Sequence, residues 1–190
     1  MSSGLAAGFL LDRQWHWLRG EMETTKKPAL LTLGRLLGES ATPYAIIGGI
    51  AVQIHHPDPR TTLDIDLAVP SRAAIPAEAL AAAGFRRTGS FEHSENWVAA
   101  DGTPVQFTDD PRLADAVSSA ATIVVDGITL RVIGVVELLH EKMRAGTDPA
   151  RRRSKRLQDL ADAEALLEVN PDLARHLSAD ERLALDRLPQ

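Results

Sequence analysis

Two aspartates and a pair of glycines carry the clearest chemical signal in the sequence. Gly48 and Gly49 follow a short apolar run, at a point where the backbone must turn tightly or approach a ligand closely. Asp64 and Asp66 stand in the segment 63–69, which alternates with period two as a β-strand does. Because alternate residues of a strand point to the same side, we expect both carboxylates to lie together on one face.

This pair of carboxylates predicts a metal site. Two ionised carboxylates on one strand face repel each other, and burying either without a partner costs several kcal/mol. Mg²⁺ is usually held by one or two carboxylates together with substrate phosphates, and a glycine turn before a helix suits phosphate. The two features together indicate a nucleoside triphosphate (NTP) site. The alternative is that Asp64 and Asp66 lie at an exposed strand end and pair with Arg60 or another basic residue.

Local patterns predict the elements that position these residues. The apolar run 44–47 indicates a buried strand, and Pro57 and Pro59 indicate an extended loop before the strand 63–69. Asp101-Gly102 and Asp126-Gly127 each predict a hairpin, because these dipeptides favour tight turns. Residues 1–24 are expected to form a helix or an arm. A further strand is expected at 85–88. Helices are expected at 29–37, 50–56, 77–83, 111–117, 135–144 with a stop at Gly146, 151–169 and from Ser178 onward.

At this point the residues resemble a known family. The order Gly48-Gly49, then Arg60-x-Thr62-x-Asp64-x-Asp66, is similar to the signature of the nucleotidyltransferase superfamily with the DNA polymerase β fold. It most resembles the AbiEii-like branch, known as toxins of type IV toxin–antitoxin and phage-exclusion systems. The resemblance implies an α/β (α+β) core with a mixed sheet, followed by a helical C-terminal part.

The resemblance also implies an activity and its partners. The expected reaction is Mg²⁺-dependent transfer of a nucleoside monophosphate from an NTP to a hydroxyl acceptor, either RNA (including tRNA ends) or protein. A cognate antitoxin is the expected protein partner. Two other functions stay open: a catalytically weak binding or regulatory protein that keeps the fold, and a small-molecule transferase of the antibiotic-modifying kind.

The family pattern assigns roles to individual residues. Asp64 and Asp66 would hold metal, Gly48 and Gly49 would contact phosphates, and Arg60 and Thr62 belong to the same nucleotide-binding motif.

A second group of residues resembles the family's later helices. Lys142 resembles a lysine that contacts the nucleotide, and Asp159 and Asp162 lie in a segment that resembles a basic-then-acidic helix motif. An ion pair between Lys155 and Asp159 on a helix is an equally good interpretation for Asp159, and a structural role is favoured for Asp162.

Gln106 is the position where the sequence departs from the family. The superfamily usually supplies a third carboxylate from a later strand, and Gln106, facing opposite to Val105 and Phe107, takes that place. A neutral amide can accept from a metal or a hydroxyl but cannot act as a base near neutral pH. Asp109 and Asp110 are candidates to compensate, although a turn role suits both better.

Composition sets broader limits. With 190 residues the chain is expected to hold an N-terminal arm or helix (1–27), a nucleotidyltransferase-like core (28–133) and a C-terminal helical part (134–190). The absence of cysteine excludes disulfides and thiol catalysis. A net charge of −5 argues against binding duplex nucleic acid over the whole surface, although 151–156 is strongly basic. The apolar run 5–11 is too short to span a bilayer, so a soluble, cytoplasmic protein is expected.

Overall fold

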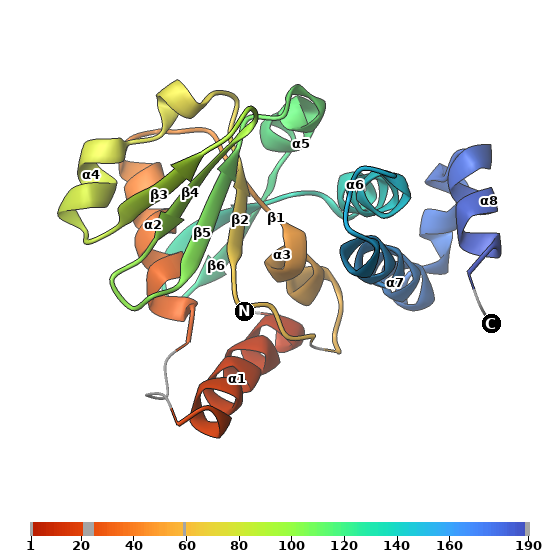
Figure 1. Ribbon diagram of the computed structural model, residues 1–190, viewed down its shortest axis with the longest axis horizontal. Helices are drawn as coiled ribbons and strands as arrows, with labels where there is room; N and C mark the ends of the chain where they lie inside the picture. Colours follow the sequence, from red (N-terminus) through yellow and green to blue (C-terminus); the bar gives the residue numbers. More distant parts are fainter. Residues whose placement is uncertain (1, 21–24, 59, 189–190) are drawn as a thin grey trace. The chain divides into compact units, whose positions relative to one another are not determined.

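A mixed seven-stranded sheet is the centre of the first unit in the computed structural model, which describes residues 2–20, 25–58 and 60–188 (Figure 1). The strands lie in the order β3-β4-β5-β2-β1-β7-β6. β1 pairs in parallel with β7 and β2 with β5, whereas the other neighbours are antiparallel. The strands are β1 (Ala45–Ile47), β2 (Ile65–Ala68), β3 (Arg86–Ser90), β4 (Ser94–Val98), β5 (Pro104–Thr108), β6 (Ala121–Val125) and β7 (Ile128–Val132). The expected mixed sheet is therefore confirmed.

The strand register gives the sheet two chemically different faces. One face is apolar and buried, and its members in register are Ile46, Ile65, Leu67, Val105, Phe107 and Val132. The other face carries Asp66, Gln106 and Asn96 in one row across β2, β5 and β4. A shift of one residue in β2 would move Asp66 into the core, so burial of the apolar set fixes the position of Asp66.

Helices cover both faces of the sheet in the first unit. α2 (Lys27–Glu39) packs against β7, whereas α3 (Gly48–His55) packs on β1 and β2. Figure 1 shows α3 on the opposite side of the strands from α2 and α4. The remaining helical segments of this unit are α1 (Ser3–Leu18), η1 (Arg72–Ala74), α4 (Ala77–Ala82), η2 (Pro111–Leu113) and α5 (Ala114–Ser118). The single helix expected over 111–117 is thus two short segments.

Both expected hairpins are confirmed. β4 and β5 pair across Asp101-Gly102, and β6 and β7 pair across Asp126-Gly127. Asp126 and Gly127 both have positive φ, 48° and 79°, which is the requirement of a type I′ turn.

The N-terminal segment is a helix rather than an extended arm. α1 packs against α3, and Leu5 and Phe9 are buried, whereas Trp17 is 65% exposed. The rest of the expected N-terminal part, at 21–24, and Pro59 of the expected loop lie outside the described residues. Across the ranges that are described, none of the helices has both the length and the apolar character that a bilayer crossing requires.

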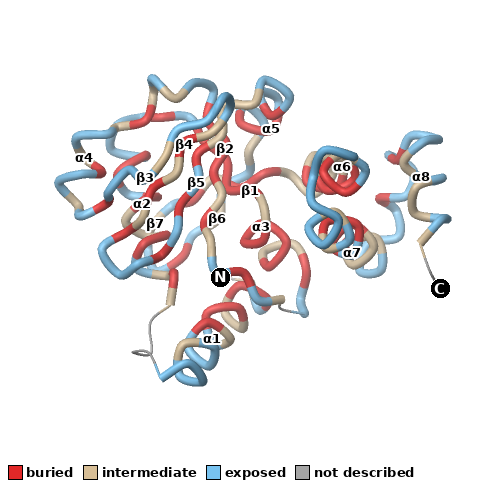
Figure 2. The backbone as a smooth tube through the Cα atoms, in the orientation of Figure 1, coloured by how far each residue is buried: buried red, intermediate tan, exposed pale blue. Residues whose placement is uncertain are grey.

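The second unit, Val135–Gln190, is helical throughout its regular structure. It contains α6 (Val135–Thr147), α7 (Arg153–Val169), η3 (Pro171–His176) and α8 (Ala179–Asp186). α6 and α7 pack along buried inner faces, whereas α8 has none of its residues buried (Figure 2). The expected stop at Gly146 lies one residue too early, because α6 ends at Thr147; the missing side chain of Gly146 leaves room for Leu160 of α7. The capping box of Ser178 and Glu181 is confirmed.

Candidate active site

Gly48 places the start of α3 directly against Asp66. The backbone of Gly48 has a φ of +63°, in the region that L side chains rarely adopt. A Cβ atom at this position would overlap the Asp66 carboxylate, which stands in register with Ile47 on the neighbouring strand. Glycine is therefore required twice, by the backbone turn and by the close approach of the carboxylate.

Gly49 brings the loop before β2 against the same turn of α3. A Cβ atom on Gly49 would lie 2.5 Å from Thr62 Oγ1 and 3.0 Å from Arg60 Nη2. Ile47, the N-cap residue, gives the first turn no side-chain hydrogen bond, and the first N–H groups of a helix have no intrahelical acceptor. The first turn of α3 thus presents backbone donors beside the Arg60 guanidinium.

Asp64 is held by its neighbour in the loop. Thr62 Oγ1 donates a hydrogen bond of 2.8 Å to Asp64 Oδ1, and Thr62 itself is buried. The expected strand 63–69 is shorter in the structure, because β2 begins at Ile65 and Asp64 precedes it. Ile65 and Leu67 are buried whereas Asp64 and Asp66 are partly exposed, which is the expected alternation. A separation of a few ångströms between the two carboxylates stays a prediction.

Gln106 stands beside Asp66 in the sheet. The parallel register of β2 and β5 pairs the two residues, and β4 places Asn96 on the other side of Gln106. Gln106 is exposed, whereas Asn96 Oδ1 is buried and has no hydrogen-bond partner within the described structure. Sequence reasoning missed Asn96, because a two-residue turn at Asp101-Gly102 would pair Gln106 with Trp97, whereas the observed connection 99–103 pairs it with Asn96.

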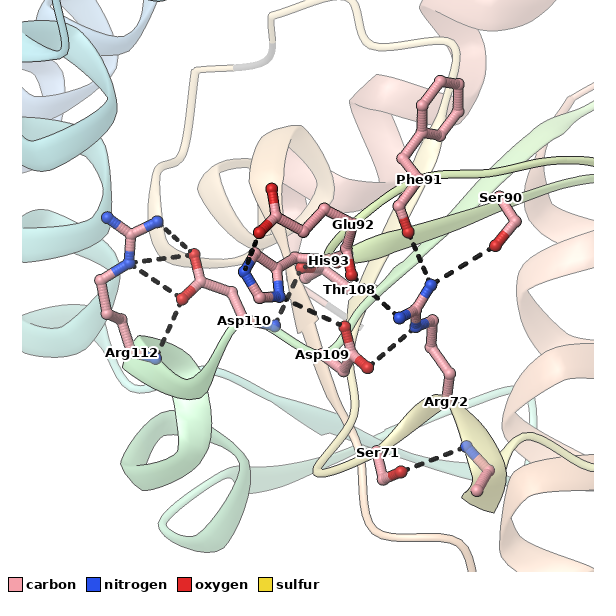
Figure 3. A network of polar contacts seen from close by, with 11 residues as sticks. Ser71, Arg72, Ser90, Phe91, Glu92, His93, Thr108, Asp109, Asp110 and Arg112 are labelled. Carbon is pink, nitrogen blue, oxygen red and sulfur yellow. Dashed lines mark hydrogen bonds and ion pairs between the residues drawn. The ribbon is translucent and has the colours of Figure 1, made fainter.

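Asp109 and Asp110, the candidates to replace the third carboxylate, are engaged in loop structure (Figure 3). Asp109 Oδ2 accepts from Arg72 Nε at 2.9 Å, and the same guanidinium donates to the Phe91 carbonyl at 2.6 Å. Asp110 caps η2 by accepting from the backbone N–H of Arg112 at 3.0 Å and also binds its guanidinium. These contacts support the turn role for both residues.

Lys142, Asp159 and Asp162 belong to the second unit and meet one another there. The Lys142 ammonium lies 2.9 Å from Asp159 Oδ1 and 3.0 Å from Asp162 Oδ2, and all three side chains are buried. Asp159 Oδ2 also accepts from Arg151 Nε at 2.9 Å. Burial alone would lower the pKa of Lys142, but the surrounding Glu141, Asp162 and Asp159 carboxylates raise it. The contact of Lys142 with a nucleotide stays a prediction.

A buried pair that the sequence did not indicate lies next to the Asp64 loop. Lys26 Nζ binds both carboxylate oxygens of Asp12 and donates to the Thr62 carbonyl at 2.9 Å. Burial lowers the pKa of Lys26, although the Asp12 and Asp64 carboxylates act in the opposite direction. Lys26, the first of two consecutive lysines, carries no sequence signal for such a position, because its partners come from α1 and from the loop.

The side-chain oxygens in the first unit suit a hard cation whose remaining ligands come from a substrate. No group of three or more His, Cys, Asp or Glu side chains within 2–20, 25–58 and 60–188 is arranged to hold a metal ion. Asp64 and Asp66 offer carboxylate oxygens and Gln106 an amide oxygen, which are ligands for Mg²⁺ rather than for soft metals. Two carboxylates with the remaining positions left to phosphate oxygens fit the usual way in which Mg²⁺ is bound.

Comparisons with known proteins find a matching family profile and solved structures of similar fold. The family profile described as "Nucleotidyl transferase AbiEii toxin, Type IV TA system" matches residues 32–188. An antigenic nucleotidyltransferase-like protein from Paracoccidioides brasiliensis has 19% identity and a TM-score of 0.57, over 85% of this chain and 88% of its own. ANT(2")-Ia, solved with adenylyl-2"-tobramycin, has 16% identity and a TM-score of 0.57, over 84% of this chain and 99% of its own. These likenesses show a shared fold, and no curated protein sequence matches.

Proposed function

The chain belongs to the AbiEii nucleotidyltransferase family, and from this premise we propose that it transfers a nucleoside monophosphate from an NTP to a hydroxyl acceptor with the aid of Mg²⁺. The observation that carries the proposal is the contact of Gly48 with Asp66. It places the first turn of α3, with its backbone N–H groups, beside the partly exposed carboxylate of Asp66. Phosphate and metal-binding groups are thereby brought to one place.

The reaction needs few groups from the protein. The acceptor oxygen attacks the α-phosphorus, the bond from that phosphorus to the bridging oxygen breaks, and pyrophosphate leaves while the proton of the acceptor hydroxyl passes to solvent water. We assign the backbone N–H groups of Gly48, Gly49 and Ile50 to the phosphates of the NTP. Arg60, whose guanidinium lies beside Gly49, would offset the negative charge that develops on the departing pyrophosphate.

Asp64 and Asp66 are the residues that would hold the metal. Mg²⁺ bound there would supply charge neutralisation for the phosphates and for the attacking oxygen. Thr62, through its hydrogen bond to Asp64 Oδ1, orients one carboxylate. Gln106 can accept a hydrogen bond from the acceptor hydroxyl or donate one to Asp66, but it cannot take the hydroxyl's proton.

The acceptor that we favour is RNA, including tRNA ends, or a protein side chain. The family description names toxins of type IV toxin–antitoxin systems, and we extend to this chain the role of toxin with a cognate antitoxin. A small-molecule acceptor is the third option, because the structurally similar ANT(2")-Ia was solved with an adenylylated aminoglycoside.

Ligand-linked stability tests the proposed site. A ligand that binds only the folded protein raises its melting temperature. Mg²⁺ and an NTP added together should therefore raise the melting temperature, and Asp64→Asn should abolish most of that rise. Asp58→Asn, an exposed carboxylate in the same loop, is the matched control and should leave the rise unchanged. Equal rises in wild type and Asp64→Asn would overturn the assignment.

One observation favours a second function, that of a binding or regulatory protein with weak catalysis. Gln106 takes the position beside Asp66 at which a third carboxylate would act. Radioactive NTPs distinguish the two functions, since a binding protein would show the stabilisation by Mg²⁺ and NTP without labelling RNA or protein.

A further inference from the structure

A buried ion pair joins the N-terminal helix to the start of α2. Lys26 and Asp12 are 3% and 1% exposed, and the Lys26 ammonium lies 2.8 and 2.7 Å from the two oxygens of the Asp12 carboxylate. An ammonium has three N–H donors, and here the pair leaves one of them for the Thr62 carbonyl, at 2.9 Å. The pair therefore fixes a backbone carbonyl of the loop before β2.

Stability alone does not account for this pair. Removing two charges from water costs several kcal/mol per ion, and apolar residues of similar volume often serve as well or better. What apolar residues cannot do is donate a hydrogen bond to a chosen carbonyl oxygen. The distinctive consequence of Lys26 is thus the position of the Thr62 peptide.

Thr62 passes this constraint to the candidate metal site. Its hydroxyl donates to Asp64 Oδ1 at 2.8 Å, and this hydroxyl oxygen, Thr62 Oγ1, also lies against Gly49 at the start of α3. Thr62 is 6% exposed, so its side chain has little room to turn. Lys26 acts on one side of this residue, through the carbonyl, and Asp64 is held on the other, through the hydroxyl.

The helix that supplies Asp12 is itself seated closely on α3. Gly4, Gly8 and Asp12 are four residues apart and so share one face of α1. A Cβ atom on Gly4 would overlap the carbonyl oxygens of Gln53 and His56. One on Gly8 would overlap the Gln53 side chain, whose Nε2 donates to the Arg60 carbonyl at 2.6 Å. This close packing fixes α1 against the end of α3 and, through Gln53, against Arg60 of the loop before β2.

We propose that Asp12 and Lys26 are positioning residues for metal binding, which hold Thr62 so that its hydroxyl orients the Asp64 carboxylate. This inference rests on the proposed function, because it assumes that Asp64 is a metal ligand. It gives α1 a role in the site without any contact with the substrate. Replacing a group that orients a metal ligand typically lowers metal affinity by about 10- to 100-fold.

The test is a Mn²⁺ titration followed by electron paramagnetic resonance, with Mn²⁺ alone standing in for Mg²⁺. Lys26→Met should weaken Mn²⁺ binding by about tenfold or more. Lys27→Met, at the adjacent position and paired instead with the turn residue Asp126, should leave Mn²⁺ affinity unchanged. Thr62→Val should weaken binding as Lys26→Met does, whereas Thr62→Ser keeps the hydroxyl and should restore most of it.

A double-mutant cycle separates positioning from general destabilisation. If Lys26 acts through Thr62, then Lys26→Met adds no further loss of Mn²⁺ affinity to Thr62→Val. Additive losses, or wild-type affinity in folded Lys26→Met, would overturn the proposal. Where Lys26→Met does not fold, the neutral pair Asp12→Asn/Lys26→Met carries the same expectation. If neither variant folds, the role of Lys26 and Asp12 is purely structural and the positioning role is rejected.

The proposed function can fail separately from this inference. If Asp64→Asn bound Mn²⁺ with wild-type affinity, the assignment of Asp64 as a metal ligand would be rejected, whatever the result for Lys26→Met. Loss of affinity in Asp64→Asn together with full affinity in Lys26→Met would leave the site intact and reject only the positioning role.

Discussion

At the scale of single residues, Gly48 meets two constraints that substitution can separate. Its φ of +63° costs any L side chain about 1–2 kcal/mol, and a Cβ would also displace the Asp66 carboxylate. Gly102 has a φ of +86° with open space around it. We expect Gly48→Ala to lose more stability than Gly102→Ala in urea unfolding, because it adds the overlap with Asp66, and only Gly48→Ala to lose stabilisation by Mg²⁺ and NTP. Equal ligand responses in the two variants would contradict the contact with Asp66.

Gln106 leads to a prediction about rate. A general base contributes roughly 10²–10⁴-fold to proton transfer, and an amide cannot supply this. Because Gln106 pairs in register with Asp66, Gln106→Asp should raise nucleotidyl transfer and strengthen Mg²⁺ binding, measured by labelling rate and by calorimetry. Gln106→Asn is the control, because it shortens the side chain and keeps the amide. A rate that stays constant or falls in Gln106→Asp would show that this position does not carry the missing base.

At the scale of elements, Lys142 tests whether the α6–α7 contact is structural or catalytic. Its ammonium lies between the buried Asp159 and Asp162 carboxylates, so Lys142→Met would remove the buried positive charge that both face, although Asp159 keeps its contact with Arg151. We expect a loss of about 3–5 kcal/mol in denaturant unfolding of the protein. Lys155→Met, on the exposed start of α7, should change stability by no more than about 0.5 kcal/mol. A stable but inactive Lys142→Met would instead support the nucleotide contact implied by the family.

Glu141, on the same helix, makes the stability of the protein depend on pH. Burial raises the pKa of its carboxyl, with the neighbouring Asp159 charge in support, and Glu141 Oε2 has no hydrogen-bond partner among the described residues. The folded state therefore holds this proton to higher pH than the unfolded state, so the carboxyl's contribution to stability falls as pH rises from its unfolded pKa to its raised folded pKa.

Glu141→Gln removes this titration. We expect the variant to gain stability over wild type as the pH rises above about 4.5, with no gain at lower pH. Urea unfolding at a series of pH values measures the difference, and Glu168→Gln, an exposed carboxylate on α7, should show none. A constant difference across the series would contradict the raised pKa.

Elements that depend on local chemistry could be predicted from the sequence. Both Asp-Gly hairpins, the strand of Asp66 and the capping box of Ser178 follow from turn, alternation and capping rules. The contact of Gly146 with Leu160 could not be predicted, because Leu160 belongs to the next helix and only tertiary packing brings the two together.

At the scale of the whole molecule, the family motif predicted the fold, and long-range contacts supplied what it left open. Gly48 contacts Asp66 and Gly49 contacts Thr62, and the register adds Asn96 beside Gln106. Lys26 could not be found from sequence, since its partners are 14 and 36 residues away along the chain. The boundaries expected at 27 and 133 stay predictions.

The measurement that tests the central claim most directly is transfer of label from α-³²P NTPs. Purified protein should label RNA or protein when Mg²⁺ is present, lose the label when Mg²⁺ is chelated, and release pyrophosphate in equal amount. Asp64→Asn and Asp66→Asn should abolish the transfer, whereas Asp58→Asn, at an exposed carboxylate of the loop, should retain it. Labelling that persists at the wild-type level in Asp64→Asn and Asp66→Asn would contradict the assignment of this site as a nucleotidyltransferase centre.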